Sequence, residues 1–184
     1  FKKETIVISI VAGKKIKFIE ENLTYIQKVV RVMPNMPALI AQSMNCIIVN
    51  KFINKNKREA ISKLFEFTGK TIFMDNENQI DMATAVSGSG PGYIYSFIDS
   101  MEKSANELGF KKNISQTLVL QTFKGSIDLL LEKKLTASDM VKKIATKGGT
   151  TEAGLKILNK YKMQNILKKT LKSAYKRAKA QGKK

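Results

Sequence analysis

The period of the hydrophobic pattern changes near residue 80, and this change constrains the fold more than any other feature of the sequence. Before it, short apolar and β-branched runs alternate with amphipathic segments; after it, apolar residues recur at intervals of three and four. The first pattern is typical of an α/β layer and the second of packed helices. We therefore predict two domains, an α/β domain over residues 1–79 and an all-helical domain over residues 80–184.

The first domain is expected to contain four short strands and two helices. We predict strands at 6–12, 29–32, 45–49 and 71–74, and helices at 15–23 and 57–68. Continuous apolar runs are typical of strands in a parallel sheet covered on both faces. Because four short strands would leave an exposed edge, and because Phe1 stands directly before a buried-type strand, we expect further elements of this sheet to belong before Phe1.

The second domain is expected to consist of five helices. Two long apolar stripes predict helices over 94–108 and 114–131, and Thr136 with Asp139 resembles a capping box that opens a third. The last two helices carry the apolar positions Leu155, Leu158, Leu167, Leu171, Ala174 and Ala178. The two long stripes carry more apolar surface than a monomeric helical domain could bury. We therefore expect a homodimer, or a larger oligomer of dimers.

The charge balance raises nucleic acid or an anionic membrane as a partner. The chain has 33 basic and 15 acidic residues, a net charge of +18. Only three of the basic residues are Arg, and the lysines are spread over the whole length. Nucleic-acid sites favour Arg and interleaved aromatic side chains, and no apolar run reaches the 18 residues of a membrane span. We expect solvated lysines, with neither a nucleic-acid nor a membrane partner.

The metal-binding and redox-active residues are few. Cys46 is the single cysteine, and the chain has no histidine. An internal disulfide framework is therefore excluded, and no zinc or haem site is expected. A lone cysteine fits a reducing compartment such as the cytoplasm.

Three segments have the composition of ligand-binding loops. Residues 31–38, Arg-Val-Met-Pro-Asn-Met-Pro-Ala, follow a predicted strand, where ligands of open α/β sheets bind; a rigid turn is the alternative. Residues 85–93, Ala-Val-Ser-Gly-Ser-Gly-Pro-Gly-Tyr, form a glycine-rich stretch that suits either close approach to a ligand or a flexible hinge.

The third segment is Thr146-Lys147-Gly148-Gly149-Thr150-Thr151-Glu152, just before a predicted helix. Backbone N–H groups at a helix N-terminus, reached through glycines, form a site for a carboxylate or phosphate. N-capping by Thr150 or Thr151 is the alternative, but it does not require the pair of glycines.

Together these segments resemble pyrroline-5-carboxylate reductase, the last enzyme of proline biosynthesis. Residues 9–13 resemble the family's Ser-x-x-Ala-Gly, and residues 31–38 its Arg-Val-Met-Pro-Asn-Thr-Pro-Ala element. Residues 85–93 are similar to Ala-Val-Ser-Gly-Ser-Gly-Pro-Ala-Tyr, and residues 148–151 to the end of Pro-Gly-Gly-Thr-Thr. The order and spacing also agree, and the resemblance runs over essentially the whole chain.

The resemblance implies the C-terminal part of a Rossmann-like dinucleotide-binding domain followed by an all-α dimerisation domain. It implies reduction of 1-pyrroline-5-carboxylate to L-proline with NADPH or NADH, with Thr151 as the catalytic proton donor to the ring nitrogen. The implied substrate-binding residues are Ser87, Gly88, Ser89, Gly90, Thr146, Gly148, Gly149, Thr150 and Thr151. The implied cofactor-binding residues are Ala12, Met33, Pro34 and Asn35, and no metal is expected.

The sequence departs from the family pattern in several places. It contains no GxGxxG-like turn for the dinucleotide pyrophosphate, so a catalytically inactive fragment that only dimerises is the alternative function. Lys147 stands where the family usually has Pro, Thr146 where it has Ser, and Gly92 where it has Ala. Glu152 replaces an apolar residue and adds negative charge beside the proposed carboxylate site.

Overall fold

The computed structural model describes residues 4–182, and these form two compact units. The first unit combines the chain up to Gly92 with the chain from Lys169 onward, and the second is Tyr93–Lys168. These units are defined by packing and do not test the predicted domain boundary between residues 79 and 80, which stays a prediction.

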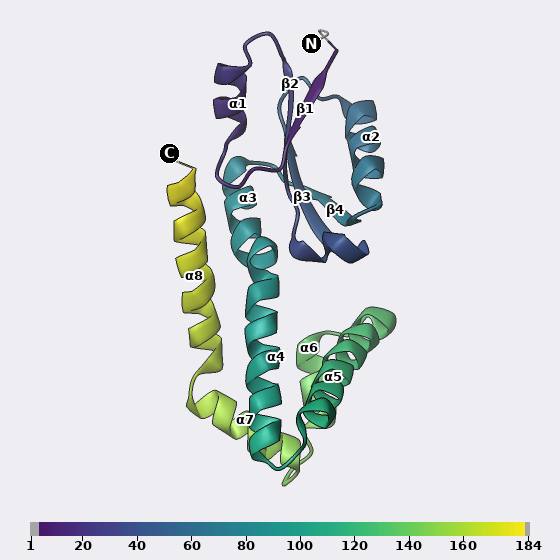
Figure 1. The fold of residues 1–184 in the computed structure, drawn as a ribbon, viewed down its shortest axis with the longest axis vertical. Helices are drawn as coiled ribbons and strands as arrows, with labels where there is room; N and C mark the ends of the chain where they lie inside the picture. The colour runs from purple at the N-terminus through teal and green to yellow at the C-terminus, as the bar shows by residue number, and fades with distance from the viewer. Residues whose placement is uncertain (1–3, 183–184) are drawn as a thin grey trace. The chain divides into compact units, whose positions relative to one another are not determined.

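The first unit is built around a four-stranded sheet with the order β1-β2-β3-β4 (Figure 1). Its strands are β1 (Ile6–Ser9), β2 (Lys28–Met33), β3 (Ser43–Val49) and β4 (Gly69–Phe73). β1 pairs with β2 in parallel, β2 with β3 antiparallel, and β3 with β4 in parallel. The expected all-parallel sheet is therefore wrong. The connection between β2 and β3 holds only the 3₁₀ helix η1 (Met36–Ile40), which is too short for the crossover that parallel pairing needs.

Helices cover both faces of this sheet (Figure 1). α1 (Ile16–Asn22) and α3 (Glu77–Ala83) bury Ile16, Ile19 and Ile80 against one face. α2 (Lys55–Glu66) buries Ile61 against the other. β2 contributes alternately to both faces, with Val29 in one core cluster and Val30 in the other. This two-sided burial is the reason that β2 and β3 carry apolar residues at successive positions, as in Val29-Val30 and Ile47-Ile48.

The glycine-rich stretch after α3 is helical, so the expected loop or hinge is wrong. A π-helical turn, η2 (Thr84–Gly88), continues α3, and α4 (Gly90–Glu107) begins two residues later. A Cβ on Gly88 would lie 2.8 Å from Cε of Met33, so glycine here permits close packing of η2 on β2. Pro91 stands in the first turn of α4, where no N–H is needed for the helix ladder.

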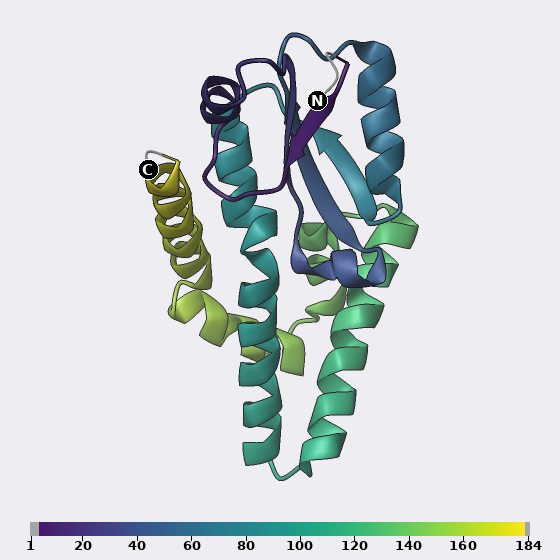
Figure 2. The same ribbon diagram turned by 45° about the horizontal axis from the view of Figure 1, so that its top comes forward.

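The remaining helices agree with the predicted pattern. They are α5 (Lys112–Lys133), α6 (Ala137–Ile144), α7 (Thr150–Lys160) and α8 (Met163–Gln181). Thr136 caps α6 as predicted, because its Oγ1 accepts from the N–H of Asp139 at 3.1 Å. The C-terminal end of α8 belongs to the first unit and lies beside the connection between β1 and α1 (Figure 2).

The second unit has almost no core of its own. Of residues 93–168, all of which the structure describes, only Ser115 and Val119 are buried. Large apolar side chains remain exposed along its helices, among them Ile94, Phe97, Leu118, Ile127, Leu131, Ile144 and Ile157. No helix within the described part of the chain is long and apolar enough to cross a membrane.

Candidate active site

The carboxyl ends of β1 and β2 lie at one edge of the sheet, because the two strands run parallel with Ser9 opposite Arg31. Ala12 follows β1 in the connection to α1 and is exposed. Met33 ends β2, and Pro34 and Asn35 follow it, all three partly buried. The four residues implied as cofactor ligands therefore come from the two chain segments that leave this edge, where open α/β sheets bind nucleotides.

Asn35 uses three hydrogen bonds to hold the segment after β2. Its Nδ2 donates to the carbonyl oxygen of Ser87 at 3.0 Å, and its Oδ1 accepts from the N–H of Met44 at 3.1 Å. Its backbone N–H donates to Oγ of Ser43 at 3.2 Å. The side chain thus uses both the donor and the acceptor of its amide group.

The bond from Asn35 joins two of the predicted segments within the first unit. Ser87 and Gly88 end η2, Ser89 links it to α4, and Gly90 begins α4 and is buried. With Met33 packed on Gly88 and Asn35 bonded to Ser87, the structure brings the loop after β2 and the glycine-rich stretch into direct contact.

Cys46 lies beneath this contact on the neighbouring strand. Its side chain is buried, and its Sγ lies 3.8 Å from Oγ of Ser87. Burial raises the pKa of the Cys46 thiol, and the hydrogen bond with Ser87 lowers it by a smaller amount. The net effect is a neutral thiol, which is a poor nucleophile and a poor metal ligand.

An ion-pair cluster that the sequence did not predict lies in the same unit as this edge. The guanidinium of Arg31, buried in β2, pairs with the carboxylates of Glu77 and Asp81 on α3. The second oxygen of Glu77 accepts from the N–H of Ile16 at 2.7 Å, in the first turn of α1. The cluster thus ties α1, β2 and α3 together. Its signal in the sequence is an Arg inside an apolar strand and two acidic residues four apart.

The third predicted segment forms a glycine turn before α7 in the second unit. Gly148 has φ of +77°, a conformation that favours glycine. Gly149 is the N-cap of α7, and a Cβ there would lie 2.7 Å from Oγ1 of Thr146. The backbone conformation therefore favours glycine at position 148, and a Cβ at position 149 would force the Thr146 side chain to move. Thr150 and Thr151 are the first two residues of α7, so the alternative in which one of them caps the helix is wrong.

Two N–H groups of this turn already have acceptors within the chain. The N–H of Gly149 donates to the carbonyl oxygen of Thr146 at 3.0 Å. The N–H of Gly148 donates to Oε2 of Glu152 at 2.9 Å, and that same oxygen lies 3.3 Å from Nζ of Lys156. The negative charge noted in the sequence at Glu152 therefore lies directly on the turn.

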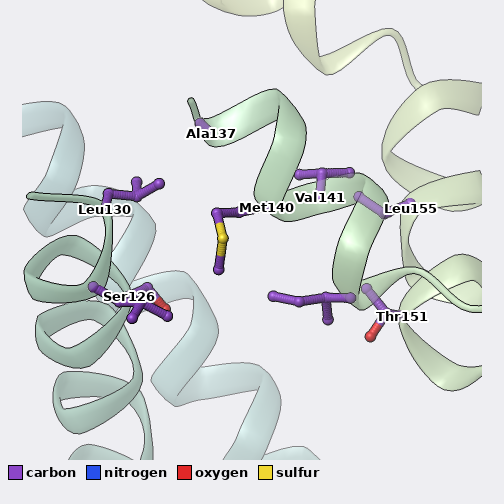
Figure 3. Close-up of a pocket in the computed structure, with 9 residues that line it drawn as sticks. Ser126, Leu130, Ala137, Met140, Val141, Thr151 and Leu155 are labelled. Carbon is purple, nitrogen blue, oxygen red and sulfur yellow. The ribbon is translucent and has the colours of Figure 1, made fainter. Parts of the chain in front are cut away.

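Thr151 also lines an apolar pocket of about 280 Å³ within the second unit (Figure 3). The pocket lies between α5 on one side and α6 and α7 on the other. Ser126 and Thr151 supply hydroxyl groups to a lining that is otherwise apolar, with Met140, Val141 and Leu155 among its members. Within residues 4–182, no three His, Cys, Asp or Glu side chains are grouped to hold a metal ion.

The predicted site residues thus fall into two groups, each ordered within its own unit. The first unit holds Ala12, Met33, Pro34, Asn35, Ser87, Gly88, Ser89 and Gly90. The second unit holds Thr146, Gly148, Gly149, Thr150 and Thr151.

Known proteins share both the sequence and the fold. Residues 77–181 match the family described as pyrroline-5-carboxylate reductase dimerisation. Pyrroline-5-carboxylate reductase 2 of Bacillus subtilis is 35% identical over 176 residues, which are 96% of this chain. The chain spans 63% of the length of that relative.

Solved structures extend the similarity to the whole chain. A pyrroline-5-carboxylate reductase from Coxiella burnetii has a TM-score of 0.93 and 30% identity, over 98% of this chain and 68% of that one. The pyrroline carboxylate reductase of Plasmodium falciparum, solved with NADP bound, has a TM-score of 0.89 and 32% identity, over 96% and 67%. Since the family match covers residues 77–181 and these relatives agree over nearly all of the rest, this chain belongs to the pyrroline-5-carboxylate reductase family.

Proposed function

We propose that this chain acts in the reduction of 1-pyrroline-5-carboxylate to L-proline by NADPH or NADH. The observation that carries the proposal is the glycine turn before α7, where Gly148 has a positive φ and a Cβ on Gly149 would lie 2.7 Å from Oγ1 of Thr146. A turn that places two glycines directly before a helix N-terminus suits a carboxylate ligand. It lies in a chain similar over 96% of its length to a pyrroline-5-carboxylate reductase.

We place the substrate at this turn because the substrate carries a negatively charged carboxylate. The backbone N–H groups of Gly148, Gly149 and Thr150, with Thr146 supporting them, are the proposed carboxylate site. The field at the N-terminus of α7 favours an anion by about 0.3–1 kcal/mol, and by more where the site is partly buried. Ser87, Gly88, Ser89 and Gly90 are proposed to line the substrate site as well.

Thr151 is the proposed proton donor. It is the second residue of α7, and it lines the pocket shown in Figure 3. A hydroxyl that donates to the ring nitrogen of the imine increases the electrophilic character of the neighbouring carbon. The apolar side chains beside Thr151 would pack against the ring and exclude water, which would otherwise compete for that hydrogen bond.

The edge formed by β1 and β2 fits the nicotinamide end of the cofactor. Ala12, Met33 and Pro34 present small or apolar groups that are at least partly accessible, and Asn35 fixes the backbone between them and η2. The flat nicotinamide ring can lie against such a surface, because Asn35 holds the neighbouring backbone in place. When bound, NADPH or NADH supplies the hydride that reduces the imine.

A homodimer is the proposed assembly, and it would be the building block of any larger oligomer. The second unit buries only Ser115 and Val119 by itself, which is too little apolar surface to stabilise a helical unit. A second copy of the same helices is the partner that the dimerisation family supports. Light scattering at micromolar concentration should give twice the mass of 20.6 kDa; a monomer mass would contradict the assembly.

The reaction itself can be tested by following NADPH oxidation with 1-pyrroline-5-carboxylate. Residues 1–184 alone are expected to show little or no reductase activity, because their sequence has no glycine-rich pyrophosphate turn. A chimera in which the N-terminal strand and glycine-rich turn of a related reductase precede residue 1 should be active. Failure of the folded, dimeric chimera to oxidise NADPH would contradict the proposed function.

Within that chimera, Thr151→Val keeps the shape of the side chain and removes the hydroxyl. We expect it to lower the rate of reduction by roughly ten- to a hundred-fold or more, the low end of general-acid effects. Thr122→Val, on the exposed side of α5, is the matched control and should leave the rate unchanged. An unchanged rate for Thr151→Val would make water the better candidate for the proton donor.

A cytoplasmic location is proposed with this function, supported by the free thiol of Cys46. We propose no nucleic-acid or membrane partner, because the basic residues are almost all lysines dispersed along the chain.

A further inference from the structure

The glycine turn before α7 carries its own carboxylate. Oε2 of Glu152 accepts the N–H of Gly148 at 2.9 Å. Glu152 is the third residue of α7, from which a side chain can reach back over the helix N-terminus. The side chain is partly exposed, at 34%, so it can leave the turn without disturbing a core.

The contact has the same chemistry as the one proposed for the substrate. A carboxylate oxygen accepts a backbone N–H, and one N–H in this geometry serves a single acceptor well. The N–H of Gly149 is already directed to the carbonyl oxygen of Thr146. Of the three N–H groups proposed to hold the substrate carboxylate, Gly148 is therefore the one for which an internal carboxylate competes.

We infer that Glu152 is an internal competitor for the substrate carboxylate, and that it weakens the binding of anionic ligands at the turn until it is displaced. The inference rests on the proposed function, because it takes the turn as the substrate site. Glu152 is accordingly an affinity-determining residue and takes no part in the chemical step.

Lys156 gives the displaced side chain an alternative partner. Its Nζ lies 3.3 Å from the same oxygen of Glu152, one helical turn further along α7. When a substrate carboxylate takes the N–H of Gly148, Glu152 can keep its ion pair with Lys156 on the exposed face of the helix. Displacement therefore leaves neither charge without a partner.

Two substitutions separate the charge of Glu152 from its hydrogen bond. Glu152→Leu removes both, and Glu152→Gln keeps an oxygen that can accept from Gly148 but removes the charge. Glu107→Gln, an exposed carboxylate at the end of α4, is the control for a change of one unit in net charge. Circular dichroism establishes that each variant is folded before it is compared.

The ligands are L-proline, which carries the carboxylate, and L-prolinamide, which has the same ring and a neutral amide in its place. Calorimetric titration of residues 1–184 should show that Glu152→Leu binds L-proline about tenfold more tightly than the original chain, the scale of one charge-assisted hydrogen bond. Glu152→Gln should lie between the two, and Glu107→Gln should match the original chain. L-prolinamide should gain nothing from any substitution.

Hydrogen exchange at the amide of Gly148 reports on the contact without any ligand. The amide should exchange faster in Glu152→Leu than in the original chain, and L-proline should slow it again in the variant.

The outcomes distinguish the inference from the function on which it rests. If the original chain binds L-proline in preference to L-prolinamide and Glu152→Leu binds it no more tightly, the competition is wrong and the substrate site stands. If no folded variant binds L-proline and the Gly148 amide is insensitive to it, the substrate site is wrong and the inference fails with it.

Discussion

The side chain of Asn35 donates to the carbonyl oxygen of Ser87 at 3.0 Å, across 52 positions of the chain. This single bond joins the loop after β2 to the π-helical turn η2, and so connects a proposed cofactor segment to a proposed substrate segment. The opposite end of the same amide accepts from Met44 on β3. The amide is therefore used in both directions, which neither Asp nor Leu could reproduce.

Asn35→Asp should destabilise the first unit by about 1–3 kcal/mol, because it places a carboxylate oxygen against the carbonyl oxygen of Ser87. Urea denaturation at a fixed protein concentration, followed by circular dichroism, measures the free energy of unfolding. Asn113→Asp, exposed in the first turn of α5, is the matched control and should change it by less than about 0.5 kcal/mol. Equal stability of Asn35→Asp and the original chain would show that the bond to Ser87 contributes nothing.

Arg31→Met should be the most damaging change in the ion-pair cluster. It leaves the buried carboxylate of Asp81 without its guanidinium partner, at a cost of about 3–5 kcal/mol. Adding Asp81→Asn to Arg31→Met should recover part of that loss in the same urea experiment. Glu21→Gln, which breaks an exposed pair with Lys17, should cost less than about 1 kcal/mol. Failure of the second substitution to recover stability would mean that packing, and not the unpaired charge, sets the cost.

Two glycines should respond oppositely to alanine. Gly69 has φ of +145°, and a Cβ there would lie 2.2 Å from the carbonyl oxygen of Ser43, so Gly69→Ala should cost at least about 2 kcal/mol. Gly125 lies within α5 with no atom within 4 Å of its added Cβ, so Gly125→Ala should stabilise the helix by about 0.5–1 kcal/mol. Thermal denaturation of the two variants compares them directly, and a folded Gly69→Ala of unchanged stability would contradict the strain at β4.

Stability should fall in alkaline solution partly through Cys46. Burial raises the pKa of this thiol above its ordinary value of 9.0, so the folded state binds the proton more tightly than the unfolded state does. The resulting stability is fully present below about pH 9 and is lost as the pH rises from there through the folded pKa. Urea midpoints measured from pH 8 upward should therefore decline more steeply for the original chain than for Cys46→Ala. Parallel declines would show that other groups account for the whole effect.

Much of the fold follows from local sequence patterns. Short continuous apolar runs predict every strand of the described structure, and apolar residues three and four positions apart predict every long helix, to within a few residues. Thr136 and Asp139 predict the start of α6, because a capping box is complete within four residues. The motifs at residues 31–38, 85–93 and 148–151 likewise identify the family from short segments, without any knowledge of how they pack.

The tertiary structure decided the features that depend on residues far apart in the chain. The antiparallel pairing of β2 with β3, the helical form of residues 84–88, and the ion pairs of Arg31 with α3 all follow from the path of the chain, which no local pattern specifies. Gly88 illustrates the reason: its sequence predicts flexibility, but the side chain of Met33 occupies the space that a Cβ would need. In the sequence, a glycine predicts a flexible backbone. Only the fold shows that a side chain from a distant part of the chain packs closely against it.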